Sequence, residues 1–217
     1  MTILITGAGR GIGRALLEAY RNAGAEVIGT CRGTPPAPGR WIRLDVRAEA
    51  DHAAMAAELA GQPIDLLVCN AGIFPQAGRS LDQPHDAAAW QDAFATNVTG
   101  VFQTVQALLP NLRRGPGRIA IIGSAMGSHS RAPGGSYLYR ATKAAVLNLG
   151  RNLAHDLRPE GIAVGVYHPG WVRTDMGGAG AEIDPERSAQ GLAARFADLD
   201  LATSGCFRSH DGPDIPF

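Results

Sequence analysis

Residues 6–13, TGAGRGIG, decide the fold when they are taken together with their two flanks. The apolar run at residues 3–5 precedes them as a buried strand would, and apolar residues at helical spacing follow them. Glycines permit a tight turn and a close approach of the backbone to a pyrophosphate, whose charge the next helix N-terminus stabilises. The stretch therefore predicts a nucleotide-binding loop, with these candidate contacts: Gly7, Gly9, Arg10, Gly11, Ile12 and Gly13.

The rest of the chain repeats this pattern of strand and helix. Short apolar runs predict strands at residues 2–6, 26–31, 41–44, 66–70, 118–123, 163–167 and 206–208. Segments of helical spacing, several of them rich in Ala, predict helices at residues 13–23, 48–60, 86–112, 137–157 and 185–197. The expected fold is α/β, a single Rossmann-type, doubly wound parallel sheet of about seven strands flanked by helices. No linker divides the chain, so one domain is expected over residues 1–217.

The connection between the second and third expected strands is unusually short. It has about eight residues, 33–40, and three of them are proline. A parallel crossover normally takes roughly a dozen residues or more and carries a helix. We therefore expect a shortened crossover in which that helix is missing or reduced to a turn, which leaves an open edge beside the adenosine end of a bound nucleotide.

Composition and charge exclude several classes of function. The formal net charge is +0, so no bulk electrostatic attraction favours nucleic acid or an anionic membrane. No apolar run reaches the ~18–20 residues of a membrane span, and the first residues do not resemble a signal peptide. Three widely spaced cysteines, Cys31, Cys69 and Cys206, predict reduced thiols in a cytoplasmic protein. No residues have metal-ligand spacing, so no metal is expected.

The end of the second expected strand favours NADP(H) over NAD(H). An acidic residue there accepts the ribose hydroxyls of NAD, whereas an arginine accommodates the 2′-phosphate of NADP. This strand ends in Cys31 and Arg32, without an acid, and Arg10 could supply a second guanidinium. The alternative is that Arg32 only ends the strand at the surface.

Tyr139 and Lys143 form a Y-x-x-x-K pair on an expected helix, where both side chains share one face. Lys143 is the only lysine of the chain. A tyrosine has a reference pKa of ~10, and a neighbouring ammonium stabilises the phenolate and lowers that pKa. The pair is thus a candidate for acid–base catalysis, although such pairs also occur on helices for structural reasons.

Six motifs in order resemble the short-chain dehydrogenase/reductase family over nearly the whole chain. Gly7, Gly11 and Gly13 are similar to its cofactor loop, and Tyr139 with Lys143 to the core of its catalytic tetrad. The other matching residues are Asp45-Val46, Asn70-Ala71-Gly72, Asn97, Ser124, and Pro169, Gly170, Val172 and Thr174 of the segment PGWVRT. The stretches around Ser124, Tyr139 and residues 168–178, and the ending DGPDIPF, look like the C-factor/sniffer-type carbonyl reductase group.

The resemblance implies a role for each matching residue. Tyr139 would exchange a proton with the substrate oxygen and would also contact the cofactor. Lys143 would lower the pKa of Tyr139 and bind the nicotinamide ribose, and Ser124 would hold the substrate oxygen. Asn97 would support a water-linked proton path, and Asp45 and Val46 would contact adenine. The segment from Pro169 to Thr174 would position the carboxamide. Ser124 could instead simply end a strand, and Asn97 could be a surface residue or mark a kink.

The implied function is an oxidoreductase that moves a hydride between NADP(H) and a small carbonyl or alcohol substrate. The alternative is an NADP(H)-binding regulatory or signalling protein with little turnover. Two features depart from the family pattern: Ser124 and Tyr139 lie fifteen positions apart, and a short Gly-rich lid at about residues 175–184 replaces a longer helical one. Members commonly pair through the two long helices, so a homodimer is expected beside the alternative of a monomer.

Overall fold

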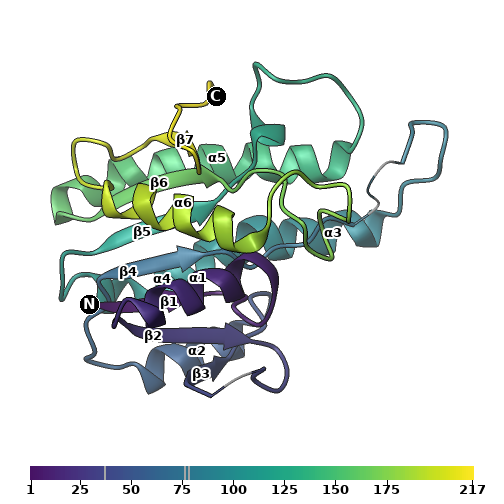
Figure 1. Ribbon diagram of the computed structural model, residues 1–217. Helices are drawn as coiled ribbons and strands as arrows, with labels where there is room; N and C mark the ends of the chain where they lie inside the picture. Colours follow the sequence, from purple (N-terminus) through teal and green to yellow (C-terminus); the bar gives the residue numbers. More distant parts are fainter. Residues whose placement is uncertain (37, 76, 78) are drawn as a thin grey trace.

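A single sheet of seven parallel strands runs through the protein, in the order β3-β2-β1-β4-β5-β6-β7 (Figure 1). The computed structural model describes residues 1–36, 38–75, 77 and 79–217. Every strand is short, and most side chains of β1, β2 and β4 are buried, as expected for a sheet covered on both faces. The strands are β1 (Thr2–Ile5), β2 (Glu26–Cys31), β3 (Arg40–Arg43), β4 (Leu66–Cys69), β5 (Arg118–Ile122), β6 (Ala163–His168) and β7 (Phe207–Ser209).

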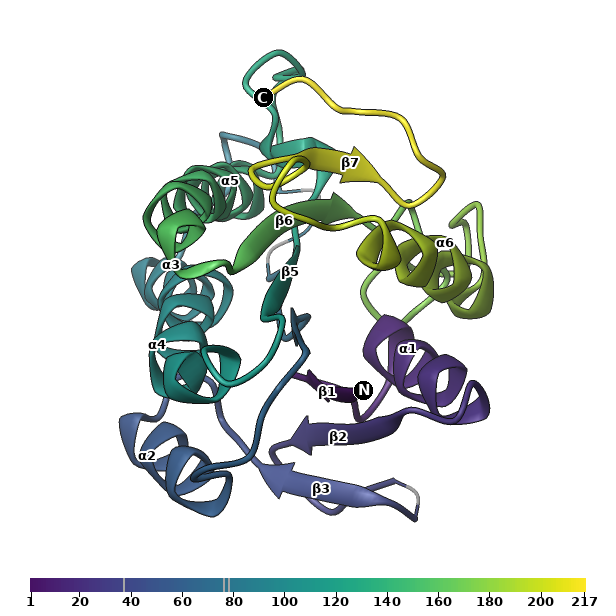
Figure 2. The same ribbon diagram turned by 90° about the vertical axis from the view of Figure 1, so that its left-hand side faces the viewer.

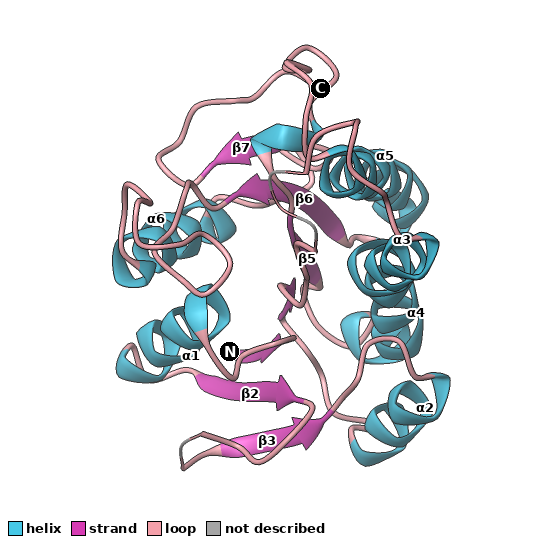
Figure 3. Ribbon diagram, turned by 90° about the vertical axis from the view of Figure 1, so that its right-hand side faces the viewer, coloured by secondary structure: helices cyan, strands magenta, loops and turns pink. Residues whose placement is uncertain are grey.

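Helices cover both faces of this sheet. One face carries α1 and α6, which pack against each other, and the other carries α2, α3, α4 and α5 (Figures 2 and 3). Their bounds are α1 (Gly11–Asn22), α2 (Glu49–Glu58), α3 (Ala87–Phe94), α4 (Gly100–Leu112), α5 (Tyr137–Leu157) and α6 (Pro185–Ala197). The expected doubly wound α/β fold is therefore confirmed. No helix in the described residues is long and apolar enough to cross a membrane.

Two apolar cores follow from this arrangement, one on each face. Beneath α1 and α6, residues such as Ile5, Leu16 and Phe196 are fully buried. On the other face, Leu67 and Leu108 belong to a larger core beneath α2, α4 and α5. The chain reverses its direction of winding between β1 and β4, which are neighbours in the sheet. In folds of this kind a ligand binds at that switch point, beyond the carboxyl ends of the strands.

The shortened crossover is present. β2 and β3 pair in parallel, with Cys31 opposite Arg43, and the described residues between them form no helix. Ala37, which falls within this connection, lies outside the described residues. The edge of the sheet beside the end of β2 is therefore not covered by a crossover helix.

The long helix expected at residues 86–112 is divided by a π-helical turn. α3 leads into the turn Ala95–Thr99, and α4 continues from Gly100. Such turns insert one residue into an α-helix and are frequent at functional sites. The turn contains Asn97, so this residue lies where the regular α-helix is interrupted. The first helix also begins earlier than expected, at Gly11, which places the glycine loop directly at its first turn.

Candidate active site

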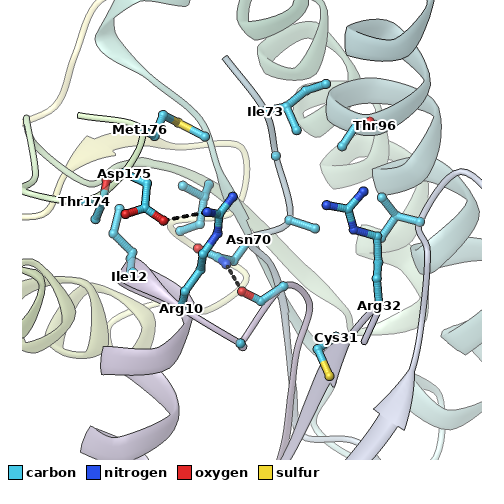
Figure 4. Close-up of a pocket in the computed structure, with 18 of the residues that line it drawn as sticks. Arg10, Ile12, Cys31, Arg32, Asn70, Ile73, Thr96, Thr174, Asp175 and Met176 are labelled. Carbon is cyan, nitrogen blue, oxygen red and sulfur yellow. Dashed lines mark hydrogen bonds and ion pairs between the residues drawn. The ribbon is translucent and has the colours of Figure 1, made fainter. Parts of the chain in front are cut away.

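A cleft of about 640 Å³ lies at the carboxyl ends of the strands (Figure 4). Its volume falls in the range of roughly 300–1,000 Å³ that is usual for small-molecule and cofactor sites. One end is formed by the glycine loop and the end of β2, and the other reaches Tyr139 and Lys143 on α5. The cleft therefore connects the nucleotide motifs of the sequence to the Y-x-x-x-K pair.

Glycines in the loop are required by close packing of the backbone. A Cβ on Gly13 would lie 2.4 Å from Nδ2 of Asn70 and 2.5 Å from the carbonyl oxygen of Gly7. Gly7 itself has a φ of 65° and lies so close to Ala71 that a Cβ would be 2.9 Å from its Cα. Side chains at these positions would push α1 away from β1 and β4, so the loop keeps its shape only with glycine.

The first turn of α1 offers donors for an anion. No side chain caps this helix, and its first turn carries no acidic residue. The backbone N–H groups of Gly11, Ile12 and Gly13 have no hydrogen-bond partner in the part of the chain that the structure describes. Free N–H groups and the positive end of the helix dipole suit a pyrophosphate, so these residues fit the dinucleotide that the motif predicts.

Three arginines line the cleft beside the glycine loop and the end of β2, and two of them already have acidic partners. Arg10 pairs with Asp175, with 2.5 Å between its Nη1 and the carboxylate (Figure 4). Arg47 pairs with Asp45 at 2.8 Å. Arg32 makes no hydrogen bond or ion pair within the described residues, and its guanidinium stands in the cleft. It is thus the arginine most available to a phosphate.

Asp45 is bound through its carboxylate by one neighbour. Arg47 donates to it from Nε, from Nη2 and from its backbone N–H, at 2.8–3.1 Å. The side-chain hydrogen bond from Arg47 is the main reason why the pKa of Asp45 falls to about 2. Asp45 is therefore ionised and held in one orientation beside the cleft, and Arg47 is a pocket residue that the sequence motifs did not identify.

Asn70 supports the glycine loop from β4. Its Nδ2 donates to the carbonyl oxygens of Thr6 and Gly7 at 2.9 and 3.2 Å, and the Thr6 hydroxyl accepts the backbone N–H groups of Asn70 and Ala71. These hydrogen bonds join the two strands on either side of the switch point. The N-A-G element lines the cleft, and its amide side chain is used to hold the loop.

Asn97 is buried at the π-helical turn and uses its amide to tie two other segments together. Its Oδ1 accepts the backbone N–H of Ile73 at 2.8 Å, and its Nδ2 donates to the Ile73 carbonyl at 2.9 Å. The same Nδ2 donates to the hydroxyl of Thr142 on α5 at 3.1 Å. Asn97 therefore fixes α5 and the segment after β4 relative to each other, and it does not line the cleft.

Tyr139 lies at the inner end of the cleft with only 9% of its surface exposed. The ring of Phe74 stacks on it, with centroids 4.1 Å apart and an interplanar angle of 25°. Burial raises the pKa of Tyr139 to about 12, and a hydrogen bond with Ser124 opposes that rise. Ser124 stands after β5 and is also buried. A phenol with this pKa is protonated near neutral pH and can donate a proton.

Lys143 is buried one turn further along α5. Its Nζ donates to the carbonyl oxygen of Ile122 at 2.8 Å and lies 5.6 Å from the centroid of the Tyr139 ring. Burial lowers the pKa of Lys143 to about 8. The lowering of the Tyr139 pKa that the sequence predicted for this pair is not found, because the burial of the phenol outweighs any effect of the ammonium.

The structure brings most of the predicted site residues to the cleft. Its lining includes Gly7, Gly9, Arg10, Gly11, Ile12, Gly13, Arg32, Asp45, Val46, Asn70, Ala71, Gly72, Tyr139, Lys143, Pro169 and Thr174. Asn97, Ser124, Gly170 and Val172 lie outside that lining. Ile73, which the sequence predicted to lie near the substrate, also lines the cleft. Lining residues that the sequence did not identify include Arg47, Thr96, Asp175 and Met176. Asp175 directly follows a motif residue, Thr174, so its position in the sequence was a usable signal.

The segment after β6 is a loop closed at its base. Val172 and Ile183 form an isolated bridge, and the backbone N–H of Arg173 donates to the Ile183 carbonyl at 2.8 Å. Nε1 of Trp171 donates to the carbonyl of Gly177 at 2.9 Å. This loop brings Asp175 and Met176 to the mouth of the cleft, opposite the glycine loop (Figure 4).

Known proteins resemble the chain in sequence and in structure. C-signal from Myxococcus xanthus is 36% identical over 166 residues, which cover 76% of this chain and 99% of that protein. The NADPH-bound carbonyl reductase from chicken fatty liver superposes with a TM-score of 0.91 at 27% identity, over 100% of this chain and 98% of that one. Carbonyl reductase Sniffer of D. melanogaster superposes with a TM-score of 0.90 at 28% identity, over 100% of this chain and 99% of that one.

The expected likeness to the C-factor and sniffer-type group is confirmed by these relatives. The family model described as short chain dehydrogenase matches residues 1–183, which include the glycine loop, the Y-x-x-x-K pair and the segment after β6. The chain therefore belongs to the short-chain dehydrogenase family, whose members are oxidoreductases.

Proposed function

We propose that the protein reduces a small carbonyl compound with NADPH, or oxidises the corresponding alcohol with NADP⁺. The observation that carries the proposal is the cleft itself. One end has an arginine and helix N–H groups without partners among the described residues, and the other has a buried tyrosine and lysine. Aldehydes, ketones and quinones all have the carbonyl group that such a pair would act on. Two solved structures of similar fold are carbonyl reductases by their descriptions.

NADP(H) is the proposed cofactor, and the residues present fit it. The N–H groups at the start of α1 would hold the pyrophosphate, and Arg32 would bind the 2′-phosphate beside the open edge of the sheet. Asp45 and Val46 would contact adenine, and Pro169, Gly170, Val172 and Thr174 would hold the carboxamide. The nicotinamide ring supplies or accepts the hydride when the cofactor is bound. A chicken relative of the same fold is described as bound to NADPH.

The proposed proton transfer uses residues of α5 and β5. During reduction the Tyr139 hydroxyl donates its proton to the substrate oxygen, while the Ser124 hydroxyl holds that oxygen in place. The Lys143 ammonium lies one turn away and stabilises the phenolate that remains. Asn97 keeps α5 and the segment after β4 in register, which is the support that its hydrogen bonds indicate.

A panel of aldehydes, ketones and quinones tests the proposal, with NADPH oxidation followed by absorbance. We expect turnover by the wild type on at least one substrate and a loss of about 10²-fold or more in Tyr139→Phe, the size typical of general acid catalysis. Tyr137→Phe is the matched control, because Tyr137 lies two residues away and is 38% exposed. Equal, slow oxidation of NADPH by wild type and Tyr139→Phe on every substrate would overturn the proposal.

A second candidate function is an NADP(H)-binding regulatory protein with little turnover. The observation in its favour is the similarity to a protein named C-signal, which this chain covers over 99% of its length. Retention of both Tyr139 and Lys143 in a buried position favours the enzyme. Tight NADPH binding by the wild type without product from any carbonyl would favour the regulator.

Several further expectations belong to this proposal. Residues 1–217 would act as one domain, and the loop at about residues 175–184 would close over the substrate. The protein would be cytoplasmic. Its assembly would be a homodimer through α4 and α5, where Phe102 is 44% exposed, or a monomer. Sedimentation velocity of the purified protein distinguishes the two assembly states.

A further inference from the structure

The loop between β5 and α5 carries Ser124 and leads to Tyr139, and its shape is held first from the side of α5. Nε of Arg140 donates to the carbonyl of Gly135 at 3.1 Å. Its Nη1 donates to the carbonyls of Met126 and Arg131 at 3.3 and 3.1 Å. One guanidinium within the Y-x-x-x-K segment therefore contacts the loop at its beginning, middle and end.

The start of the loop also packs against the backbone of α5. Ser124 accepts the backbone N–H of Met126 at 3.1 Å and thereby caps the short 3₁₀ turn Ala125–Gly127. A Cβ on Gly127 would lie 2.6 Å from the carbonyl carbon of Lys143. Any shift of this turn would thus move Ser124 relative to the helix that carries Tyr139 and Lys143.

The opposite side of the loop is held by the last residues of the sequence. The hydroxyl of Ser128 donates to the carbonyl of Pro216 at 2.5 Å. The hydroxyl and the backbone N–H of Ser130 both donate to the backbone oxygen of Phe217, at 2.9 and 3.3 Å. Ser128 is 3% exposed, so its hydrogen bond is made in a buried setting where an unpaired hydroxyl would be costly.

This final segment is itself attached to the sheet and to α5. The Phe217 ring packs against Phe207 of β7 with centroids 5.7 Å apart, and the guanidinium of Arg151 on α5 lies 4.3 Å from its centroid. The backbone N–H of Ile215 donates to the carbonyl of Phe207 at 2.8 Å, and the Ile215 side chain is 6% exposed. Pro216 and Phe217 are therefore held in place by two elements of the fold.

We propose that Ser128 and Ser130, through their hydrogen bonds to Pro216 and Phe217, are positioning residues that hold the Ser124 loop in register with Tyr139. The inference rests on the proposed reductase function. A reacting group displaced by about 1 Å can lose roughly 10²-fold in rate, so a loop held on one side only is expected to slow the chemical step. The nucleotide end of the cleft is built from other segments and would keep its affinity.

The double variant Ser128→Ala/Ser130→Ala tests the proposal, with His129→Ala as the control from the same loop. His129 is exposed and makes no hydrogen bond within the described residues. We expect kcat for the carbonyl substrate to fall about tenfold in the double variant, with the Kd for NADPH and the pH profile of kcat unchanged. His129→Ala is expected to match the wild type, and restoring the hydroxyl alone in Ser128→Thr/Ser130→Thr should recover part of kcat.

The outcomes separate this proposal from the one on which it rests. A wild type that reduces no carbonyl defeats the reductase function itself. An active wild type with a double variant of equal kcat defeats the positioning role. A double variant that loses NADPH affinity in proportion to kcat also defeats it, because that result would mean a general loss of structure.

Discussion

The two ends of the cleft are built on different principles. The end beside the glycine loop uses backbone N–H groups, glycines and exposed arginines, of which Arg32 is unpaired within the described residues. The end beside Tyr139 uses buried polar side chains, and Asn97, Ser124 and Lys143 are each no more than 6% exposed. Charges in water act weakly and are screened by salt, whereas buried groups are expensive to leave unpaired. We therefore expect the first end to determine the affinity for the cofactor and the second end to determine the rate of the chemical step.

Four tests distinguish the two ends of the cleft, and the largest effect on kcat is expected for Lys143→Arg. A guanidinium is bulkier and permanently charged, so it cannot occupy the position of the ammonium beside Ile122 and Tyr139. We expect kcat to fall by about 10²-fold, at the lower end of the range for acid–base groups. Steady-state kinetics give kcat, and circular dichroism checks that the fold is retained.

Asn152→Ala, on the exposed side of the same helix, is the control for this substitution. It should have the kcat of the wild type. Near-normal activity of Lys143→Arg would mean that the single lysine has no special role. It would also remove the main support for the view that the buried end of the cleft determines the reaction rate.

The pH dependence of the reduction rate should follow the protonation state of Lys143. Its pKa is lowered to about 8, so the ammonium is present below that pH and is lost as pH rises through it. The Tyr139 pKa of about 12 keeps the phenol protonated over the same interval. We expect kcat for reduction to fall about tenfold for each pH unit above roughly 8, as for a single essential protonated group. A flat profile from pH 6 to 10 would contradict this role.

Arg32→Ala changes the other end of the cleft, so we expect it to change the affinity for the cofactor and to leave kcat unchanged. A lost hydrogen bond to a charged group costs about 1.5 kcal/mol at the low end, so the Kd for NADPH should rise roughly tenfold. The Kd for NADH, which has no 2′-phosphate, should not change, and Arg32→Lys should keep part of the preference. Fluorescence titration measures both constants. Equal affinity of the wild type for NADPH and NADH would remove the basis for an NADP preference.

The smallest effect is expected for Asp175→Ala. The ion pair between Arg10 and Asp175 is more than three-quarters exposed on both side chains, and exposed pairs contribute about 0.2–1 kcal/mol. Its removal frees Arg10 and takes one negative charge from the mouth of the cleft. The Kd for NADPH should therefore fall by up to about fivefold at low salt, with no change at high salt. Glu182→Ala, in the same loop, should show neither change.

Features that depend on local sequence were predictable. Strand and helix positions follow from the spacing of apolar residues. Gly13 and Tyr139 belong to motifs in which the spacing of the residues determines where their atoms lie. The described part of the connection between β2 and β3 has no helix, and this also followed from chain length, since about eight residues cannot cross a sheet with a helix.

Features that depend on distant contacts were not predictable in the same way. The pairing of Arg10 with Asp175 joins residues 165 positions apart, and no motif contains both. The sequence predicted Asn97 to be a site residue, but not its partners Ile73 and Thr142, which come from two other segments. The pKa of Tyr139 is raised because the fold buries the ring. The spacing of Tyr139 and Lys143 on a helix had predicted a lowered pKa, because spacing alone contains no information on burial.

Transfer of deuterium from NADPH that carries deuterium at both C4 positions of the nicotinamide tests the proposed hydride transfer. The label is measured by mass spectrometry of the alcohol formed from the best aldehyde or ketone substrate. We expect one deuterium on the carbinol carbon with the wild type. With Tyr139→Phe we expect unchanged NADPH binding and about 10²-fold slower formation of the same product. NADPH consumption without label in the alcohol, or equal rates for the two proteins, would contradict the proposed reduction.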